Sequence, residues 1–243
     1  MRDLPFRVHA HHSILLRKLG DADMRLQHNK VTNLRLAAAC MDRVLIKPGE
    51  TFSLWKLVGK PTAKRGFLPG MMLSKGEVIE GIGGGLCQTA NMLYWMALHS
   101  PLTIVERYRH SFDPFPDSGR VLPFGSGATI FYNYIDLQLR NDTQNTFEIR
   151  LWLDENSLRG ELRSEKITDT TYHIFERNHH FYREMSTGLN YRGNQIWREV
   201  LERSTGKLLG EEMVCANFCE MKYPIPENAQ PLELNVSHGT LKQ

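Results

Sequence analysis

The sequence predicts an α+β fold in which N-terminal helices pack on an antiparallel sheet and a β-rich extension follows at the C-terminus. Two observations lead to this fold class. Apolar residues recur at spacings of three and four only in the first hundred residues, which is typical of helices. After Leu102 the chain carries alternating, β-branched and aromatic runs separated by proline- and glycine-rich loops, which is typical of antiparallel strands.

The first half carries the helical signals. Residues 14–45 show a helical spacing, which the sequence Lys47-Pro48-Gly49-Glu50 ends. Residues 51–55 then predict a short buried segment or strand. Residues 56–85 are rich in glycine and proline, with an extended piece at 77–79, and long irregular stretches of this kind often border a functional site.

A second helix is predicted from Cys87 to His99, ended by Ser100-Pro101, and it directly precedes the central strands. Strand-like runs follow at 103–111 and 128–140, and FEIRLWL and SLRGELRS predict a hairpin. A change of character near residue 165 predicts three regions. They are an α+β core at 1–165, a β-rich extension at 166–225 and a disordered tail at 226–243.

Composition excludes several classes of protein. The formal net charge of +3 over 243 residues comes from scattered Lys and Arg without a basic run, so we expect no nucleic-acid partner. No stretch reaches the ~20 apolar residues of a membrane span. The first residues lack a sustained apolar region and a small-residue cleavage site, and the four cysteines are dispersed. These observations predict a cytoplasmic protein without disulfides.

The segment that ends at Cys87 has the features of a nucleophile site. Gly83, Gly84 and Gly85 permit left-handed backbone and close approach of a ligand. A thiol at a helix N-terminus has its thiolate stabilised by the helix dipole, and the free N–H groups there can bind an oxyanion. The alternative is that Cys87 is a small core residue, and that the glycines only let the helix pack closely on a strand.

A nucleophilic thiol needs a base, and His110 at the end of the first predicted strand is the candidate. Asp136 interrupts the apolar strand Tyr134-Ile135-Asp136-Leu137 and is the candidate for orienting that histidine. The order of cysteine on a helix, then histidine and aspartate on later strands, resembles that of transglutaminase-like thiol enzymes. The alternatives are an exposed strand-end histidine and an Asp136 that pairs with Arg140 or Arg150.

A metal site is the weaker candidate. Cys215 and Cys219 have a spacing that zinc tolerates, with His179 and His180 as possible further ligands. Adjacent histidines on a strand point to opposite faces, so both binding one ion is unfavourable. We therefore expect no metal and no cofactor. The other histidines near the start are expected in a mobile N-terminus: His9, His11 and His12.

Three segments resemble the VanW family. They are PGETFSLWKLVGKPTAKRGF, GIGGGLCQTANMLYWMALHSPLTIVERYRHS and PFGSGATIFYNYIDLQLRNDT, and the likeness spans residues 30–165. The sequence is particularly similar to the short form associated with B-type vancomycin resistance clusters. The resemblance implies a bacterial protein connected with the cell envelope. It places the family's cysteine on Cys87 with Gln88, its histidine on His110 with Ser111, and its strand aspartate on Asp136.

Two functions remain open at this point. In the first, Cys87, His110 and Asp136 form a thiol enzyme that acts on an amide bond of peptidoglycan or its precursors, by acyl transfer or hydrolysis. Substrate would lie against Gly83, Gly84, Gly85, Gln88 and Ser111. In the second, the chain is a non-catalytic accessory or binding module that recognises a wall precursor, or a partner protein, through the same glycine-lined cleft. The sequence does not decide between an enzyme and a binding module.

Overall fold

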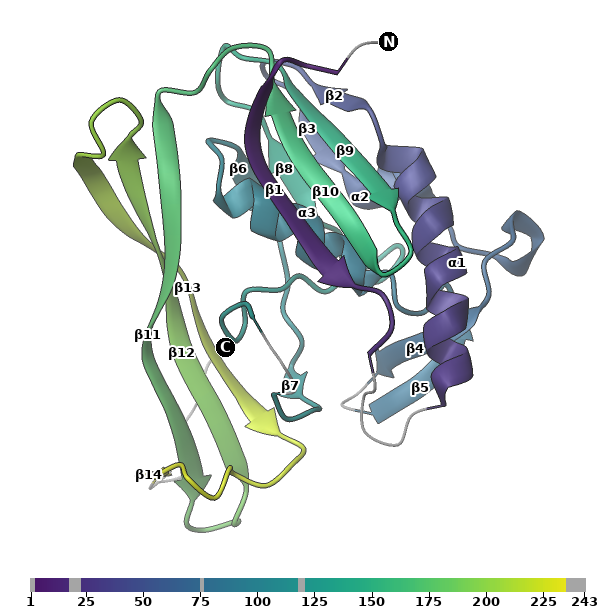
Figure 1. The fold of residues 1–243 in the computed structure, drawn as a ribbon. Coiled ribbons are helices and arrows are strands. Elements are labelled where there is room, and N and C mark those ends of the chain that lie inside the picture. The colour runs from purple at the N-terminus through teal and green to yellow at the C-terminus, as the bar shows by residue number, and fades with distance from the viewer. Residues whose placement is uncertain (1–2, 18–22, 75–76, 118–120, 235–243) are drawn as a thin grey trace.

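The computed structural model describes residues 3–17, 23–74, 77–117 and 121–234. Its elements form a mixed α+β, β-rich fold, which confirms the predicted fold class. Figure 1 shows two parts side by side, a sheet covered by helices and a long, narrow sheet that stands next to it. The candidate residues lie in the first part and in the segments between the two.

The sheet of the first part has the order β1-β10-β9-β2 and is antiparallel throughout. The strands span Phe6–Ile14 (β1), Ser157–Ser164 (β10), Phe147–Leu153 (β9) and Val44–Ile46 (β2). Alternate residues of β9 and β10 are buried, because successive side chains of a strand point to opposite faces. This apolar face lies against α1 (Met24–Met41) and α3 (Cys87–Leu98).

The packing of α3 on this sheet depends on Gly160 in β10. A Cβ at Gly160 would lie 2.9 Å from the Met96 Cε and 3.0 Å from the Met92 Sδ. The helix therefore sits close to the strand, and its side chains from Met92 to Leu98 are buried. The predicted helix from Cys87 is confirmed, and its start is fixed in space by the core behind it.

Smaller elements surround α3. The strands β3 (Thr51–Ser53), β8 (Gln138–Arg140) and β6 (Thr103–Glu106) form an antiparallel sheet in that order. The strands β4 (Pro69–Ser74) and β5 (Glu77–Ile82) form a hairpin that leads into the glycines before Cys87. Two short helices complete this region, α2 (Leu54–Val58) and the 3-10 helix η1 (Ala63–Arg65).

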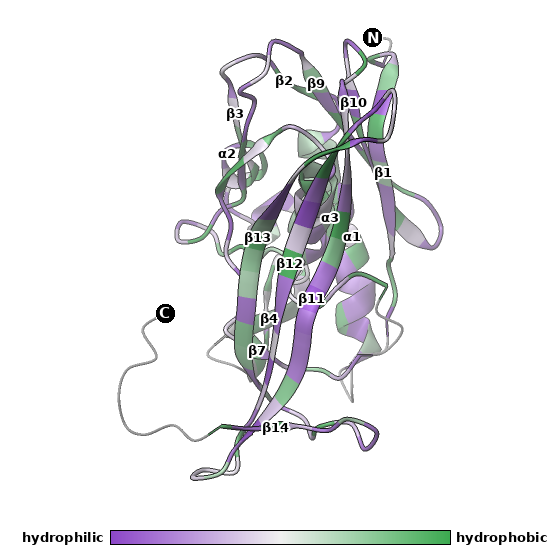
Figure 2. Cartoon of the chain, turned by 90° about the vertical axis from the view of Figure 1, so that its left-hand side faces the viewer, coloured by the Kyte–Doolittle hydropathy of each residue, from purple (hydrophilic) through white to green (hydrophobic). Residues whose placement is uncertain are grey.

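The second part is the sheet β14-β11-β12-β13-β7. Its long strands are β11 (Thr170–Glu184), β12 (Asn190–Glu202) and β13 (Leu208–Met221), joined as antiparallel hairpins. The short strands β14 (Leu232–Leu234) and β7 (Phe112–Asp113) add in parallel at its two edges. Figure 2 shows these long strands lying across one side of α3. Because β7 comes from the first part of the chain, the extension is joined to the core by a strand as well as by a linker.

Two predictions for the N-terminal region are wrong. The first histidines do not lie in a mobile N-terminus, since His9, His11 and His12 belong to β1, which pairs with β10 about 150 residues later. The helical stretch expected over 14–45 is too long at both ends, since the helix spans Met24–Met41, Ile14 is the last residue of β1, and residues 44–46 form β2. The spacing of apolar residues could not reveal β1, because a pairing between distant strands leaves no local signal.

The predicted central strands are shorter than expected. Of residues 103–111 and 128–140, β6 and β8 cover only Thr103–Glu106 and Gln138–Arg140. Asn133 has a left-handed φ of 70°, which turns the chain within the expected second strand. In the expected disordered tail, residues 232–234 form β14, and residues 235–243 lie outside the described residues. The boundary near residue 165 stays a prediction.

Candidate functional site

The glycines before Cys87 are required by backbone packing. A Cβ at Gly84 would lie 2.1 Å from the carbonyl carbon of Gly70 in β4, and one at Gly85 would lie 2.2 Å from the Lys30 Cγ on α1. Asn33 on α1 donates to the carbonyl of Gly84 at 2.9 Å. The close approach that the sequence predicted is thus made by the protein's own elements, which fix the start of α3.

The same loop presents backbone donors. The N–H groups of Gly83, Gly84 and Gln88 donate to backbone carbonyls. Among the described residues the structure records no carbonyl acceptor for the N–H groups of residues 85–87, and no side chain caps α3; the Cys87 N–H lies against its own thiol. Gly85 has φ +90°, followed by Leu86 at φ −64° and ψ −18°. This alternation of hand turns successive N–H groups toward one point, which is the geometry of an anion-binding nest.

The side chain of Cys87 is half-buried. Its Sγ lies 3.9 Å from the carbonyl oxygen of Ile130, and the residue packs against the hydrophobic core. Burial raises the pKa of the Cys87 thiol, and contacts with the backbone offset this in part. In the structure as it stands, Cys87 is a protonated thiol at a helix start, close to a set of unused N–H groups.

The segment next to the Cys87 thiol is residues 124–130, which begins in a turn at residues 124–125 and which we call the strap. Arg107 donates through Nε to the carbonyl of Gly127 at 2.8 Å and through Nη2 to that of Gly125. Asn91, one turn after Cys87 on α3, accepts the N–H of Ala128 at 2.7 Å. The N–H of Thr129 donates to the carbonyl of Tyr108 at 2.8 Å. The strap is therefore held along its length and ends on the thiol.

Asp136 has its hydrogen bonds at another place. Its carboxylate accepts from the Ser53 hydroxyl at 2.5 Å, the Trp55 N–H at 3.0 Å and the Leu137 N–H at 2.8 Å. Ser53 is itself the N-cap of α2, since its Oγ accepts from the Lys56 N–H. Asp136 thus joins the start of α2 to the turn that precedes β8. Neither Arg140 nor Arg150, the two arginines considered from the sequence, is its partner in the described contacts.

His110 lies between Tyr108, which pairs with Thr129 of the strap, and the strand β7. Burial lowers the pKa of its imidazole, and the charge of Arg107 lowers it further. Such a ring is neutral at pH 7 and can accept a proton. Within the described part of the chain, no hydrogen bond joins His110 to Cys87 or Asp136, so the ordered triad stays a prediction.

The two remaining predicted contact residues differ in exposure. Ser111 is exposed and follows His110 directly. Gln88 points to β1, because its Nε2 donates to the Ser13 hydroxyl at 2.9 Å and to the Ile14 carbonyl at 3.0 Å. Gln88 therefore ties the start of α3 to the edge strand of the main sheet, while Ser111 is open to a ligand.

Asn91 and Arg107, which hold the strap, were not among the site residues predicted from the sequence. Arg107 lies within the motif ERxRHS, and Glu106 of the same motif accepts the Asp136 N–H and the Gln138 side chain, both at 2.8 Å. The motif was a usable signal, because its first two residues fix backbone segments on either side of Ile130. Asn91 had a signal only in its spacing of four from Cys87.

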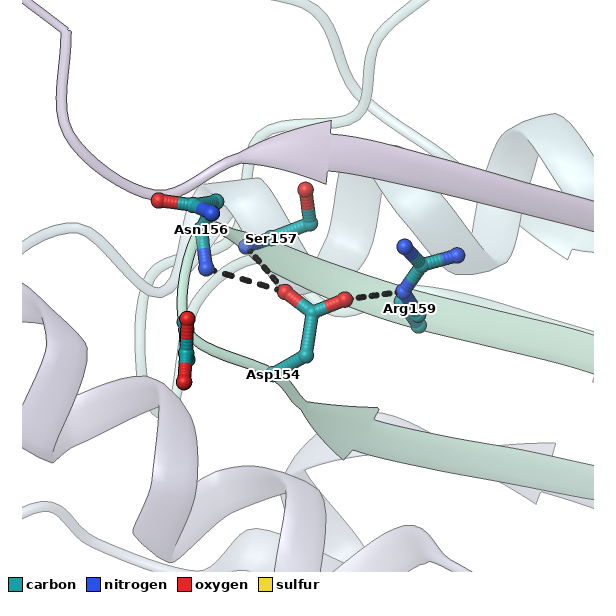
Figure 3. A pocket seen from close by; sticks show the side chains of 5 residues that line it. Asp154, Asn156, Ser157 and Arg159 are labelled. Carbon is teal, nitrogen blue, oxygen red and sulfur yellow. Dashed lines mark hydrogen bonds and ion pairs between the residues drawn. The ribbon is translucent and has the colours of Figure 1, made fainter.

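Two surface hollows lie away from Cys87. Figure 3 shows the one at the β9–β10 turn, where the Asp154 carboxylate accepts from the backbone N–H groups of Asn156 and Ser157 and from Arg159. These groups satisfy one another as in an ordinary turn. The other hollow, of about 350 Å³, lies beside Arg192, which donates to Asp117 at 2.7 Å and is 4% exposed. Neither hollow contains a candidate residue.

The described residues contain no group of three or more His, Cys, Asp or Glu side chains placed to hold a metal ion. No disulfide joins Cys215 and Cys219 in the described part of the chain. A search of the described helices for one long and apolar enough to cross a bilayer finds none.

Comparisons with known proteins give one family. A family model described as "VanW like protein" matches residues 29–163. The chain is 36% identical over 213 residues to the "Vancomycin B-type resistance protein VanW" of Enterococcus faecalis (strain ATCC 700802 / V583), covering 88% of this chain and 77% of that protein. It is 33% identical over 118 residues to the "Uncharacterized protein YoaR" of Bacillus subtilis (strain 168), covering 49% of this chain and 37% of that protein. No solved structure gives a significant match.

Proposed function

The chain belongs to the VanW family, and from this premise we propose that it acts on peptidoglycan or its precursors as a thiol enzyme centred on Cys87. The substrate class follows from the relative named as a vancomycin B-type resistance protein, since vancomycin resistance concerns cell-wall precursors. The observation that carries the reaction is the nest of N–H groups at residues 85–87 beside the thiol. A nest of this kind binds developing negative charge on a carbonyl oxygen.

The proposed reaction is acyl transfer. The Cys87 Sγ attacks an amide carbonyl carbon while His110 takes the thiol proton, and the N–H groups of residues 85–87 bind the oxyanion. Collapse breaks the C–N bond, His110 returns the proton to the leaving amine, and a thioester remains on Cys87. Water or a second amine then attacks the thioester and restores the thiol. Asp136 acts by fixing the turn before β8, and as the orienter of His110 it stays a prediction.

The resting state has to change before the thiol can react. Burial raises the pKa of Cys87, and a buried thiol is a poor nucleophile because the thiolate is the reactive form. The strap ends on the thiol at Ile130, so its displacement by a substrate would expose Cys87 to His110 and to the nest. A substrate-dependent activation of this kind also protects a cysteine from oxidation between turnovers.

The half-buried Cys87, with its raised thiol pKa, also favours a second candidate, a non-catalytic module that binds a wall precursor or a partner protein. In that case the nest holds a carboxylate or carbonyl of the ligand, and Cys87 only fills space on α3. This candidate predicts binding that survives the loss of the thiol.

The two candidates are separated by incubating the full chain with purified muropeptides and analysing the products by mass spectrometry. We expect an amide-cleavage or transfer product from the wild type, with a loss of at least about 100-fold in Cys87→Ala and in His110→Ala, the size expected for removal of a nucleophile or general base. Cys40→Ala is the matched control, since Cys40 is a free thiol on α1 that donates to the Leu36 carbonyl. Muropeptide binding without any product, unchanged in Cys87→Ala, would overturn the enzyme and establish the binding module.

A further inference from the structure

The strap over Cys87 is held at its first residue by the C-terminal sheet, which lies outside the residues matched by the family model. Asn194 on β12 donates through Nδ2 to the carbonyl of Phe124 at 2.7 Å and to the Glu176 carboxylate. Asn217 on β13 donates through Nδ2 to the Oδ1 of Asn194 at 2.8 Å. Both asparagines are 4% exposed. The amide of Asn194 thus has partners on both ends, which fixes its direction.

Gly125 shows how closely the strap lies on this pair. Its φ is +75°, and a Cβ there would lie 2.2 Å from the Nδ2 of Asn217. The backbone of the strap therefore rests directly on the Asn217 amide, and a side chain of any size at residue 125 would separate them. Glycine at this position is required by both the backbone conformation and the contact.

The strap runs from the C-terminal sheet to the thiol. It is held at residue 124 by Asn194, between residues 125 and 128 by Arg107 and Asn91, and it ends at Ile130 on Cys87. The contacts from Arg107 and Asn91 come from the core, while the contact from Asn194 comes from the extension. Loss of the Asn194 contact frees one end of the strap. The contacts with Arg107 and Asn91 alone then hold the strap over Cys87.

We propose that Asn194 and Asn217 are positioning residues that control access to the Cys87 thiol by holding the strap closed. This inference rests on the proposed function for its purpose, because the controlled group is the proposed nucleophile. It assigns the C-terminal sheet a role at the family's own candidate site. Removing a hydrogen-bonding partner leaves buried polar groups of the strap unsatisfied, which favours the open state.

The test is the rate of alkylation of Cys87 by iodoacetamide in the full chain, read by peptide mass spectrometry for each cysteine separately. We expect Asn194→Ala and Gly125→Ala to raise the alkylation rate of Cys87 on the order of tenfold. This corresponds to a tenfold increase in the equilibrium constant for opening of the strap. Asn194→Ala changes the sheet, and Gly125→Ala changes the strap where it lies on Asn217. Circular dichroism establishes that each variant is folded, and Asn217→Ala replaces Asn194→Ala if the latter is not.

The controls distinguish a released strap from a loosened protein. Cys40 on α1 is the internal reference, and its rate is expected to stay within about twofold of wild type, since surface or sheet changes elsewhere do not reach it. Gln195→Ala removes the neighbouring side chain on β12, which accepts from Asn178 and Trp197 and does not contact the strap in the described contacts. Unchanged Cys87 rates in folded Asn194→Ala and Gly125→Ala, or equal increases at Cys40, would overturn the proposal.

The pH profile of the same reaction separates this inference from the proposed function. If Cys87 in the variants with a released strap has a pKa below that of an ordinary thiol, both the control of access and the enzyme function are supported. The helix dipole and the nest then act on an exposed thiolate. A faster reaction with an ordinary pKa, together with no product from muropeptides, supports the control of access and contradicts the enzyme. The rise of rate with pH is measured between about pH 6 and pH 10, which brackets the usual thiol pKa of about 8.5.

Discussion

Cys87 is the proposed nucleophile, and its surroundings have two opposite effects on the charge of its thiol. The unused N–H groups of residues 85–87 favour negative charge near the thiol, while burial raises the pKa of the thiol itself. Local sequence predicted the first effect, because a glycine run before a helix is a local signal. It could not predict the second, because the covering carbonyl of Ile130 lies 43 residues further along the chain.

At the same scale, Gly84 gives a direct test of the packing that positions the helix start. We expect Gly84→Ala to lower the free energy of unfolding by about 1–3 kcal/mol, because its Cβ would overlap the backbone of Gly70, which cannot move aside like a flexible side chain. Urea unfolding measures this. Gly210→Ala is the control, since nothing lies within 4 Å of a Cβ there. Equal stabilities for the two variants would contradict the packing role.

At the scale of elements, the short helix α2 depends on a residue that the sequence analysis assigned to catalysis. Asp136 accepts hydrogen bonds from Ser53 and Trp55 at the beginning of α2. An aspartate between apolar residues needs a partner, and this much was predictable from the sequence around Asp136. Which partner it has depends on the β3–β8 pairing, which brings together residues about 85 positions apart.

We expect Asp136→Ala to destabilise the chain by about 1–3 kcal/mol, because it leaves donors at the start of α2 without an acceptor. Thermal unfolding with circular dichroism provides the measurement. Asp142→Ala serves as control, since Asp142 pairs with Arg140 on the exposed surface and its removal should change stability little. If Asp136→Ala keeps full stability but loses muropeptide turnover, Asp136 acts on the reaction and not on α2.

The strand β1 and the end of α3 meet through stacked histidines. The rings of His9 and His99 lie 3.9 Å apart, and burial together with the neighbouring histidines lowers the pKa of His9 to about 3. His99 also has a lowered pKa, through burial and the nearby charges of His173 and Arg198. Both rings are therefore neutral in the folded protein and take up protons more readily when it unfolds.

The lowered pKa values of His9 and His99 make the stability of the folded protein depend on pH. The unfolded chain binds more protons than the folded chain below the ordinary histidine pKa of about 6.5, so stability is complete above that pH and falls as the pH drops toward 3. We expect the double variant His9→Phe/His99→Phe, which keeps a ring stack without titration, to lose less of its melting temperature between pH 7 and pH 4 than the wild type. If the melting temperatures of the two proteins fall equally between pH 7 and pH 4, the loss of stability does not come from His9 and His99.

For the molecule as a whole, sequence patterns predicted the elements whose partners are close in the chain. The β9–β10 hairpin, the β-rich character of the extension and the helix from Cys87 all follow from local alternation, turns and spacing. The pairings β1–β10 and β7–β13 could not be predicted in this way, since they join strands about 100 or more residues apart. The contact of the C-terminal sheet with the strap has the same long-range origin.

The joining of the two parts also has a polar component at the end of α3. Arg198 on β12 donates to the carbonyls of Leu98 and Ser100, both at 3.3 Å, where the helix has ended. A cation at this position also interacts favourably with the helix dipole. The extension therefore contacts α3 at its C-terminal end and, through the strap, the thiol at its N-terminal end.

The central claim is that Cys87 forms a thioester with a muropeptide. Its most direct test is to mix the full chain with muropeptides, quench in acid and map the Cys87 peptide by mass spectrometry. We expect an added mass equal to the acyl fragment on Cys87, absent in Cys87→Ala and removed by hydroxylamine, which cleaves thioesters. An unmodified Cys87 peptide under conditions where the muropeptide is bound, or where it is turned over, would contradict the claim.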